Sequence, residues 1–406
     1  MGRIKTGNGS MVKFCIDKIV GDKPYPNLAT LNAVPFTPKW REFSVNSPFS
    51  EPMMLIEHLR EHNIEHQLVT LDEADAETFY PIALSFFDFS IDWFSLMDKQ
   101  LIKKLKQRNI KILFYYSEGD NPFDIDEHLL KQCLEHDIPR EQILFVSANT
   151  AAKTLPYFYY VADDELLFRF RNSEIPAVEY HERDRDMKYT ALVRMHKYWR
   201  ANIMSTLWQQ RLDTQGYFAY GNEITASETE DDNPIEVDRY AGLRQRTRSF
   251  IAGLPFIADT MSSDEHNNHT MSVTEHFENS YLNIVIESHM DVDRSGGVLL
   301  TEKTFKPIKN AQPFVIFGAR GSLQVLRDLG YRVFDSVLDN SYDEIENTTE
   351  RYNALITQVL DLLDNPNFLL KEFYIKCRED LLHNQQLFLS TKEDRLNNII
   401  EAIQND

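Results

Sequence analysis

The sequence contains little cysteine and no long uninterrupted apolar run. Its cysteines, Cys15, Cys133 and Cys377, are odd in number and far apart, a pattern that gives neither a disulfide framework nor a metal-binding spacing. This usage predicts a reducing compartment, so we expect a cytoplasmic protein. No apolar stretch approaches membrane-spanning length, and no signal peptide follows Met11. Residues 1–10 precede that second methionine and indicate a leader added ahead of the native start.

Positive charge is also scarce. The chain has 43 Lys and Arg residues against 63 Asp and Glu residues, for a formal net charge of −20. This balance argues against broad electrostatic binding to nucleic acid or to an anionic membrane, although it allows a local basic cleft. Hydrophobic residues make up 42% of the chain and aromatic residues 12%, which is typical of a well-packed globular protein.

Short apolar runs alternate with amphipathic segments along the chain. Strand-like runs occur at Lys111–Tyr116, Gln142–Val146 and Tyr157–Val161, and helical spacing occurs at Ser95–Arg108 and Asp126–His136. Strands that alternate with helices predict a mainly parallel sheet. The same plan returns in the second half of the chain. We therefore predict an α/β protein with two Rossmann-like domains that face each other across a cleft.

The predicted domain boundaries follow the composition. Residues 11–170 form the first domain, and the polar segment 171–188, which contains Pro176 and lacks periodicity, is the predicted linker. Residues 189–345 form the second domain. Residues 346–406 supply C-terminal helices that pack on the cleft or back on the first domain. Within this half we expect a strand at Tyr331–Phe334 and helices at Tyr352–Leu363 and Phe368–Phe388.

The most suggestive stretch has the order strand, loop, helix and strand. An apolar run, Leu282–Ile286, ends in Glu287, and a polar loop leads to a helix start at Thr301, Glu302 and Lys303. In open α/β sheets, ligands bind beyond the carboxyl ends of the strands. A Glu-Lys pair at a helix start could hold a ribose hydroxyl and a phosphate together. Alternatively, Thr301 only caps the helix and Glu302 complements its dipole.

A cluster of cationic residues lies where a strand of the second domain meets its helix. Arg194, Lys197 and Arg200 gather there together with His196. Arginine offers bidentate contacts to phosphate oxygens, so the cluster would suit a diphosphate. A solvated helix end explains the same residues.

Two carboxylates follow the run Lys111–Tyr116. Glu118 and Asp120 lie at the end of that predicted strand, where an acidic group could act as general base for an acceptor hydroxyl. The alternative is that Asp120 belongs to a turn that caps the next helix.

Metal ligands are not indicated by any spacing. The triplet Asp291-Val292-Asp293 is short and is followed by Arg294, which would oppose a cation, and His266, His269 and His276 are irregularly spaced. We expect neither a metal nor a cofactor.

Taken together, the segment Tyr281–Asp335 resembles the nucleotide-binding half of α1,3-fucosyltransferase-like glycosyltransferases. In that family an apolar strand ending in Glu leads through a loop to a Thr-Glu-Lys helix start, and an apolar strand ending in Gly follows. Here these are Ile284–Glu287, Thr301–Lys303 and Pro313–Gly318. The unbroken Thr-Glu-Lys-Thr-Phe-Lys-Pro-Ile from Thr301 to Ile308 is more similar to related glycosyltransferases of large bacteriophages. Its continuation after Lys303 differs from that of true fucosyltransferases, so the resemblance does not name the sugar.

This resemblance implies the two-Rossmann GT-B fold and a metal-independent enzyme of the cytoplasm, or of the host cytoplasm if a phage encodes it. The enzyme would move a sugar from a nucleoside-diphosphate-sugar donor to an acceptor hydroxyl with inversion. Glu302 would bind the ribose, Lys303 would contact the donor phosphates, and Arg200 with Arg194 would clamp the diphosphate. Glu118 is the nearest candidate for the catalytic carboxylate. The acceptor is a saccharide or a modified base in phage DNA.

Two other classes of function stay open. One is a catalytically inactive nucleotide-sugar-binding or structural protein that keeps the fold. The other is a nucleotide-dependent enzyme such as an epimerase, against which the lack of a Gly-x-Gly-x-x-Gly motif after the first strand counts. Basic residues in Ser95–Arg108 and Arg239–Arg248 keep a DNA acceptor possible. The sequence does not indicate an oligomeric state.

Overall fold

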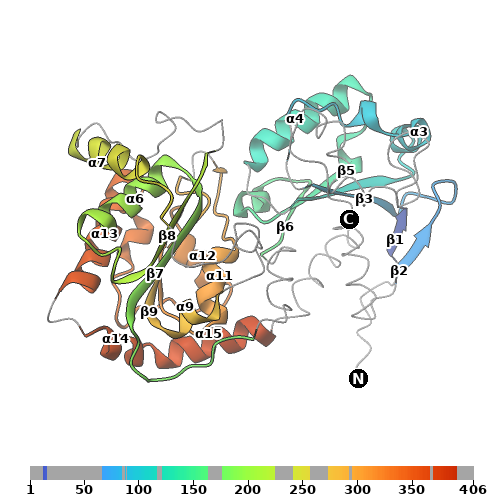
Figure 1. The fold of residues 1–406 in the computed structure, drawn as a ribbon. Helices are drawn as coiled ribbons and strands as arrows, with labels where there is room; N and C mark the ends of the chain where they lie inside the picture. Colours follow the sequence, from blue (N-terminus) through green and yellow to red (C-terminus); the bar gives the residue numbers. More distant parts are fainter. Residues whose placement is uncertain are drawn as a thin grey trace. The chain divides into compact units, whose positions relative to one another are not determined.

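The computed structural model describes a large part of the chain as two compact units. The described residues are 12–15, 66–84, 87, 89–116, 121–162, 176–224, 241–256, 273–291, 295–365 and 369–390. Those up to residue 162 belong to the first unit, together with 295–297, and the others belong to the second. Each unit is built on its own parallel sheet (Figure 1). The predicted α/β fold with two parallel sheets is confirmed.

The first unit contains a six-stranded sheet in the order β2-β1-β3-β4-β5-β6. Every neighbouring pair is parallel. The direction of the strand order reverses between β1 and β3, as in a doubly wound fold. The strands are β1 (Val12–Cys15), β2 (His66–Val69), β3 (Thr78–Leu84), β4 (Lys111–Tyr116), β5 (Ile143–Ser147) and β6 (Phe158–Tyr160).

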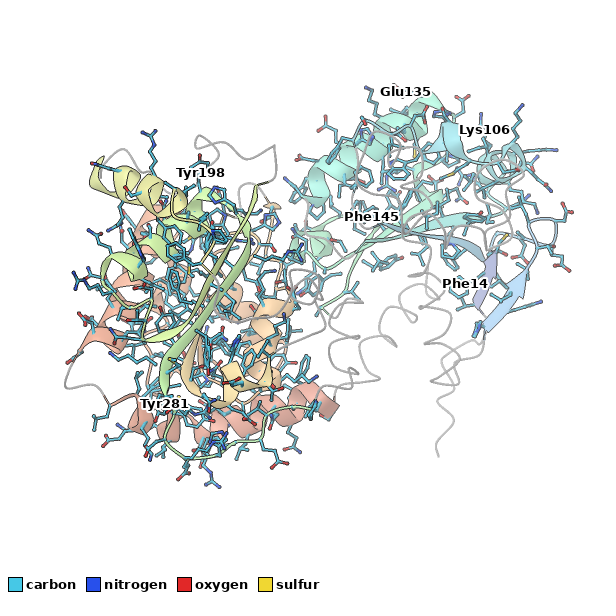
Figure 2. The ribbon with its side chains drawn as sticks, in the orientation of Figure 1. Phe14, Lys106, Glu135, Phe145, Tyr198 and Tyr281 are labelled. Carbon is cyan, nitrogen blue, oxygen red and sulfur yellow. The ribbon has the colours of Figure 1, made fainter. Side chains whose placement is uncertain are left out.

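The core of the first unit follows the alternation of side chains along buried strands. In β4, Ile112 and Phe114 belong to one apolar cluster and Leu113 to another. Phe145 of β5 packs with the first of these clusters (Figure 2) and stacks on Phe158, with ring centroids 4.8 Å apart. Because successive side chains of a strand point to opposite faces, these clusters cover both faces of the sheet.

In the first unit a helix lies between β3 and β4 and another between β4 and β5, and their starts are capped by side chains. Asp98 accepts a hydrogen bond of 2.7 Å from the Gln100 amide at the start of α3 (Lys99–Lys106). Asn121 does the same for the Phe123 amide at the start of α4 (Pro122–Glu135), where Pro122 is the first helical residue. These caps satisfy amides that have no partner within the helix. Short 3₁₀ turns lie at Phe94–Leu96, Arg140–Gln142 and Thr150–Thr154.

The second unit contains a four-stranded sheet in the order β10-β9-β7-β8. Its strands are β7 (Met187–His196), β8 (Gly216–Ile224), β9 (Ser280–Ile286) and β10 (Phe314–Phe317), and all neighbouring pairs are parallel. The chain runs from β7 outward to β8, and from β9 outward to β10 in the opposite direction. The switch point of this sheet therefore lies between β7 and β9.

Helices cover both faces of the second sheet. Because parallel crossovers are right-handed, α6 after β7 and α11 after β9 lie on opposite faces, and Figure 1 shows this arrangement. One large apolar cluster surrounds the sheet and includes Tyr281 of β9 (Figure 2). The helices are α6 (Tyr198–Gln209), α7 (Ala241–Ile251), α9 (Thr274–Glu278), α11 (Glu302–Lys309), α12 (Ser322–Asp328), α13 (Thr348–Asp364), α14 (Leu370–Lys376) and α15 (Arg378–Ser390), and a 3₁₀ turn lies at Ser341–Glu344.

Two predictions for the C-terminal half are wrong in detail. Residues 331–334 form no strand, because the buried side chains of Tyr331, Val333 and Phe334 pack into the core without a neighbouring strand to pair with. Burial alone produces the apolar pattern that was taken for a strand. The predicted final helix is divided into α14 and α15 at Cys377.

The segment before β7 is held against α14 by aromatic and cationic contacts. The rings of Tyr180 and Tyr374 stack with centroids 5.2 Å apart, and the Arg185 guanidinium lies 4.1 Å from the Tyr374 ring centroid. Next to them, both ring nitrogens of His181 are inaccessible to solvent and make no hydrogen bond within the described part of the chain. Burial, followed by the charges of Arg185 and Arg183, lowers the pKa of His181, and Glu278 opposes this effect.

This environment predicts a pH-dependent stability. The folded state resists protonation of His181, so its stabilising contribution is complete above the unfolded pKa of about 6.5 and is lost as the pH falls below it. His181→Leu should therefore flatten the fall of the melting temperature between pH 7 and pH 5. Melting curves of both proteins across that range would measure the effect. An unchanged pH profile would show that His181 does not contribute.

Candidate functional site

The predicted residues of the second domain gather at the carboxyl edge of its sheet. Glu287 directly follows β9, and Arg194 lies near the end of β7, the neighbouring strand. These two strands flank the switch point, where helices leave the sheet toward opposite faces. Such a point opens a crevice that α/β proteins use for ligands. The topology thus brings segments about 90 residues apart in sequence to one place.

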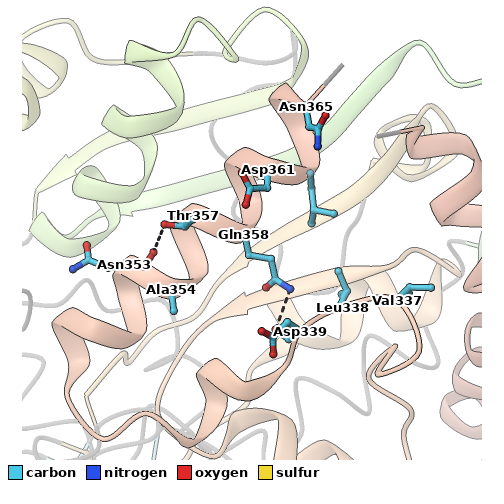
Figure 3. A pocket seen from close by; sticks show the side chains of 10 residues that line it. Val337, Leu338, Asp339, Asn353, Ala354, Thr357, Gln358, Asp361 and Asn365 are labelled. Atoms are coloured by element: carbon cyan, nitrogen blue, oxygen red, sulfur yellow. Dashed lines mark hydrogen bonds between the residues drawn. The ribbon is translucent and has the colours of Figure 1, made fainter. Parts of the chain in front are cut away.

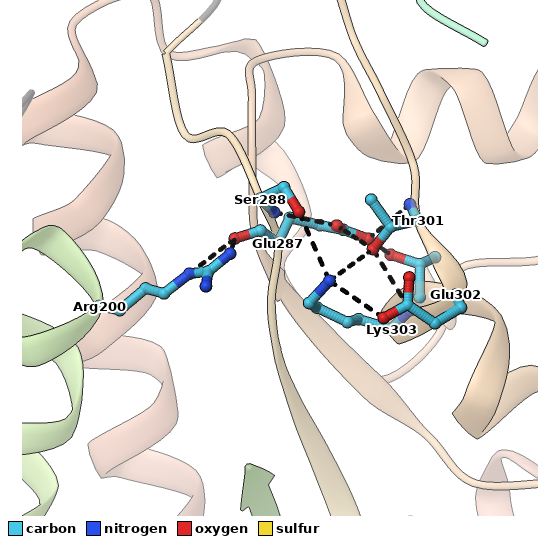
Figure 4. Close-up of polar contacts among 7 residues, drawn as sticks. Arg200, Glu287, Ser288, Thr301, Glu302 and Lys303 are labelled. Carbon is cyan, nitrogen blue, oxygen red and sulfur yellow. Dashed lines mark hydrogen bonds and ion pairs between the residues drawn. The ribbon is translucent and has the colours of Figure 1, made fainter. Parts of the chain in front are cut away.

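Glu287 is the centre of a hydrogen-bonded clasp (Figure 4). Its side chain is fully buried, and its carboxylate accepts four hydrogen bonds. Oε1 accepts from the Thr301 amide at 3.0 Å and from Thr304 Oγ1 at 2.6 Å. Oε2 accepts from Thr301 Oγ1 at 2.6 Å and from the Ser288 amide at 3.1 Å. The carboxylate thereby fixes the start of α11, where the helix dipole favours negative charge.

The clasp presents Glu302 and Lys303 in the first turn of α11. Thr301 is the N-cap, and its Oγ1 accepts from the Lys303 amide at 3.4 Å. Lys303 Nζ lies 3.1 Å from Glu302 Oε1, 3.2 Å from Thr301 Oγ1 and 3.4 Å from Ser288 Oγ. The Glu302 side chain is 7% exposed and that of Lys303 is 31% exposed. The lysine therefore keeps a face toward solvent, and its longest hydrogen bonds are weak enough to be exchanged.

Two cations at the start of α6 bind the main chain that follows β9. Arg200 is 4% exposed, and its Nε and Nη2 donate to the Glu287 carbonyl at 3.2 and 2.9 Å. Lys197 Nζ donates to the Ser288 carbonyl at 3.2 Å. Both side chains therefore help to hold the strand end in place. Through Glu287 and Ser288, the structure brings these residues close to Lys303.

Arg194 is placed by an irregularity between β7 and β8. The register shifts here, so that two residues of β8, Gly221 and Asn222, stand opposite Arg194 alone. A Cβ atom added at Gly221 would lie 2.1 Å from the Arg194 carbonyl oxygen. Only glycine fits at such an approach of two backbones, and β-bulges of this kind often re-aim a side chain next to a functional site.

Sequence reasoning missed two further groups at this edge. Tyr220 Oη lies 3.0 Å from His196 Nδ1 and accepts from the Lys197 amide at 3.3 Å, which fixes the turn from β7 into α6. Lys306 lies one turn after Lys303 on α11, is half-buried, and has the charges of Glu302, Lys303 and Arg194 around it. The helical spacing from Glu302 to Lys306 was the available signal for it.

The glycine turn Gly318–Ser322 does not offer free amides at the start of α12. The Asp343 carboxylate accepts from the Leu323 amide with both oxygens and from the Gln324 amide, each at 3.1 Å. Burial raises the pKa of Asp343 above its usual value, although these amides favour the ionised form. A carboxylate of the chain itself thus takes the place where a phosphate could have bound.

A separate groove of about 670 Å³ lies along α13 (Figure 3). Residues 337–339 form one side of it, and Gln358 bridges the sides by donating to the Asp339 carbonyl at 3.0 Å. None of the predicted site residues lines this groove.

The predicted catalytic residues Glu118 and Asp120 lie outside the described residues. Among the residues that are described, no group of three or more His, Cys, Asp or Glu side chains could hold a metal ion. No helix within the described ranges is long and apolar enough to cross a membrane. Comparisons of the sequence with protein-family models and with curated proteins find no match.

Removal of one acceptor oxygen from the Glu287 carboxylate should destabilise the folded protein. Glu287→Gln replaces one acceptor oxygen by a donor that faces Thr301 Oγ1 and the Ser288 amide. We expect the free energy of unfolding to fall by about 1–3 kcal/mol, the usual cost of a buried polar group left without a partner. Denaturant unfolding would measure it.

A matched control is Glu346→Gln. Glu346 is exposed and pairs with Arg320 at 3.2 Å, so its loss should change stability by less than about 0.5 kcal/mol. Equal effects of the two substitutions would show that Glu287 does not hold the helix start.

Proposed function

We propose that the protein is a glycosyltransferase that moves a sugar from a nucleoside-diphosphate-sugar donor to an acceptor hydroxyl. The observation that carries the proposal is the gathering of Arg194, Glu302 and Lys303 beside the switch point between β7 and β9. The carboxyl edge of a parallel sheet at a switch point, with a helix start and cations beside it, suits a nucleoside diphosphate. The resemblance of Thr301–Ile308 to phage glycosyltransferases supports the same function.

The contacts divide the predicted donor-binding residues into two groups. Glu287, Thr301 and Arg200 are engaged with one another's backbone and side chains, so we assign them to holding the site. Lys303, which keeps a solvent-facing side, would contact a donor phosphate, and Glu302 would accept from a ribose hydroxyl. Arg194 would complete the phosphate contacts from β7, and Lys197, which already donates to the Ser288 carbonyl, belongs with the residues that hold the site.

In this proposal the bond between the sugar carbon and the phosphate oxygen breaks as the acceptor oxygen attacks that carbon. The nucleoside diphosphate leaves with the bonding electron pair, and a base takes the proton of the acceptor hydroxyl. Positioned cations and the start of α11 would stabilise the charge that develops on the leaving group. The proposal assigns this task to side chains and asks for no metal ion.

The acceptor half of the proposal depends on Glu118, the sequence candidate for the base, in the segment that follows β4. The acceptor would be a saccharide hydroxyl or a modified base in phage DNA. Two of the basic residues in Ser95–Arg108 that favour a DNA acceptor already have partners in the first unit. Lys104 Nζ donates to the carbonyls of Asp72 and Ala74, and Arg108 Nη1 lies 2.6 Å from Glu141 Oε1. The contacts therefore favour a saccharide.

Loss of Lys303 should weaken donor binding. Lys303→Ala should cost about 1.5–3 kcal/mol, the usual contribution of a hydrogen bond to a charged group, which corresponds to about 10- to 150-fold in affinity. A thermal-shift screen against GDP-, UDP-, CMP- and dTDP-linked sugars would first identify the donor. Lys371→Ala, which removes an exposed lysine paired with Asp184, is the control. Unchanged donor affinity would remove Lys303 from the site.

Loss of Glu118 should affect turnover and not donor affinity. Glu118→Gln should lower the rate of transfer by about 10²- to 10⁴-fold, the usual contribution of a general base, while Glu135→Gln on the exposed side of α4 should leave it unchanged. Normal turnover would exclude Glu118 as the base. A wild-type protein that binds a nucleotide sugar but neither hydrolyses nor transfers it would favour the inactive binding protein.

A further inference from the structure

Within the described part of the chain, no hydrogen bond or ion pair accounts for the cationic side chain of Lys306. It follows Glu302 by four residues and Lys303 by three on α11, so the three side chains share a face of the helix. The residue is half-buried, and its ammonium makes neither a hydrogen bond nor an ion pair with the residues that the structure describes. By contrast, Lys303 binds three oxygens and Lys197 binds a carbonyl.

The surroundings of Lys306 disfavour its charge. Burial lowers the pKa of Lys306, the nearby carboxylate of Glu302 counteracts this, and the positive charges of Lys303 and Arg194 lower it further. A desolvated ammonium beside two other cations destabilises the folded protein unless an anion joins them. At Lys306 the charge of one carboxylate, Glu302, acts against those of two cations, Lys303 and Arg194, so this position suits a ligand with more than one negative charge.

The spacing of the cluster points to an extended anion. Lys303 and Lys306 are separated by about 4.5 Å along the helix axis, which lets their ammonium groups contact successive phosphoryl groups. Arg194 approaches from β7 on a backbone that Gly221 fixes. A single phosphate would meet fewer of these groups.

We propose that Lys306 is a further anion-binding residue of this site and gives it a preference for a diphosphate over a monophosphate. The inference rests on the proposed function for its physiological ligand. Recognition of two linked phosphoryl groups by Arg194, Lys303 and Lys306 can, however, be tested with inorganic ions alone.

The test compares binding of inorganic pyrophosphate and orthophosphate by calorimetry to the full chain and to Lys306→Met. The substitution should reduce pyrophosphate affinity about tenfold or more, as expected for a hydrogen bond to a charged group, and should reduce orthophosphate affinity less, so that the ratio of the two falls. Lys306→Arg should retain most of the ratio because it keeps the charge. Lys376→Met, at an exposed position on α14, should match the wild type.

The melting temperature of the ligand-free protein separates a binding role from a structural one. Removal of an unpartnered, desolvated charge should leave it unchanged or raise it, as is common for residues that serve function at the expense of stability. An unchanged ratio of pyrophosphate to orthophosphate affinity would overturn the proposal, whatever the melting temperature. If the melting temperature also fell, Lys306 would have a structural role.

Nucleotide sugars distinguish this inference from the proposed function. If the wild type binds a nucleotide sugar and Lys306→Met binds it equally well, the inference fails and the glycosyltransferase proposal stands. If pyrophosphate binding depends on Lys306 but no nucleotide sugar binds, the inference stands and the proposed function fails.

Discussion

The second unit depends on one buried carboxylate. The backbone of Glu287 belongs to the sheet, where its amide donates to the Phe317 carbonyl at 3.0 Å, and its side chain belongs to the start of α11. Its carbonyl oxygen accepts a hydrogen bond from the guanidinium of Arg200, which lies in α6. One residue therefore ties together β10 and two helices on opposite faces of the sheet. A carboxylate buried with four donors is tolerated because each lone-pair direction is satisfied.

This constraint explains how cations can be held close together at the sheet edge. Arg200 and Lys197 are bound to carbonyl oxygens of Glu287 and Ser288, so their charges are partly compensated by backbone dipoles. Lys303 is compensated by Glu302. Lys306 lies beside the charges of Lys303 and Arg194 and is disfavoured by burial, so it is the residue that an added anion would stabilise most. Holding residues and binding residues are thus distinguished by what they already contact.

The sequence predicts the elements of this site better than the roles within it. Apolar runs with Glu287 and Thr301 at their ends are local patterns, and they correctly predict β9 and the start of α11. The clasp between Glu287 and Thr304 could not be predicted, because it depends on how a loop of 13 residues closes. The same holds for Asp343, which reaches the start of α12 from 20 residues away, and for the bulge at Gly221. The prediction for residues 331–334 failed for the opposite reason. Their apolar pattern predicts a strand, but within the described residues no neighbouring strand lies beside them to pair with.

The charge of the whole chain and the charge of the site act on different ligands. A net charge of −20 repels a long polyanion that must approach over a large surface. At physiological salt this repulsion is screened beyond about 8 Å, so a small anion that reaches the switch point responds mainly to Arg194, Lys303 and Lys306. The proposed site would therefore select a compact diphosphate over a polymer. The acidic surface and the local cationic cluster are therefore compatible, and together they support the proposal of a small donor and an uncharged saccharide acceptor over duplex DNA.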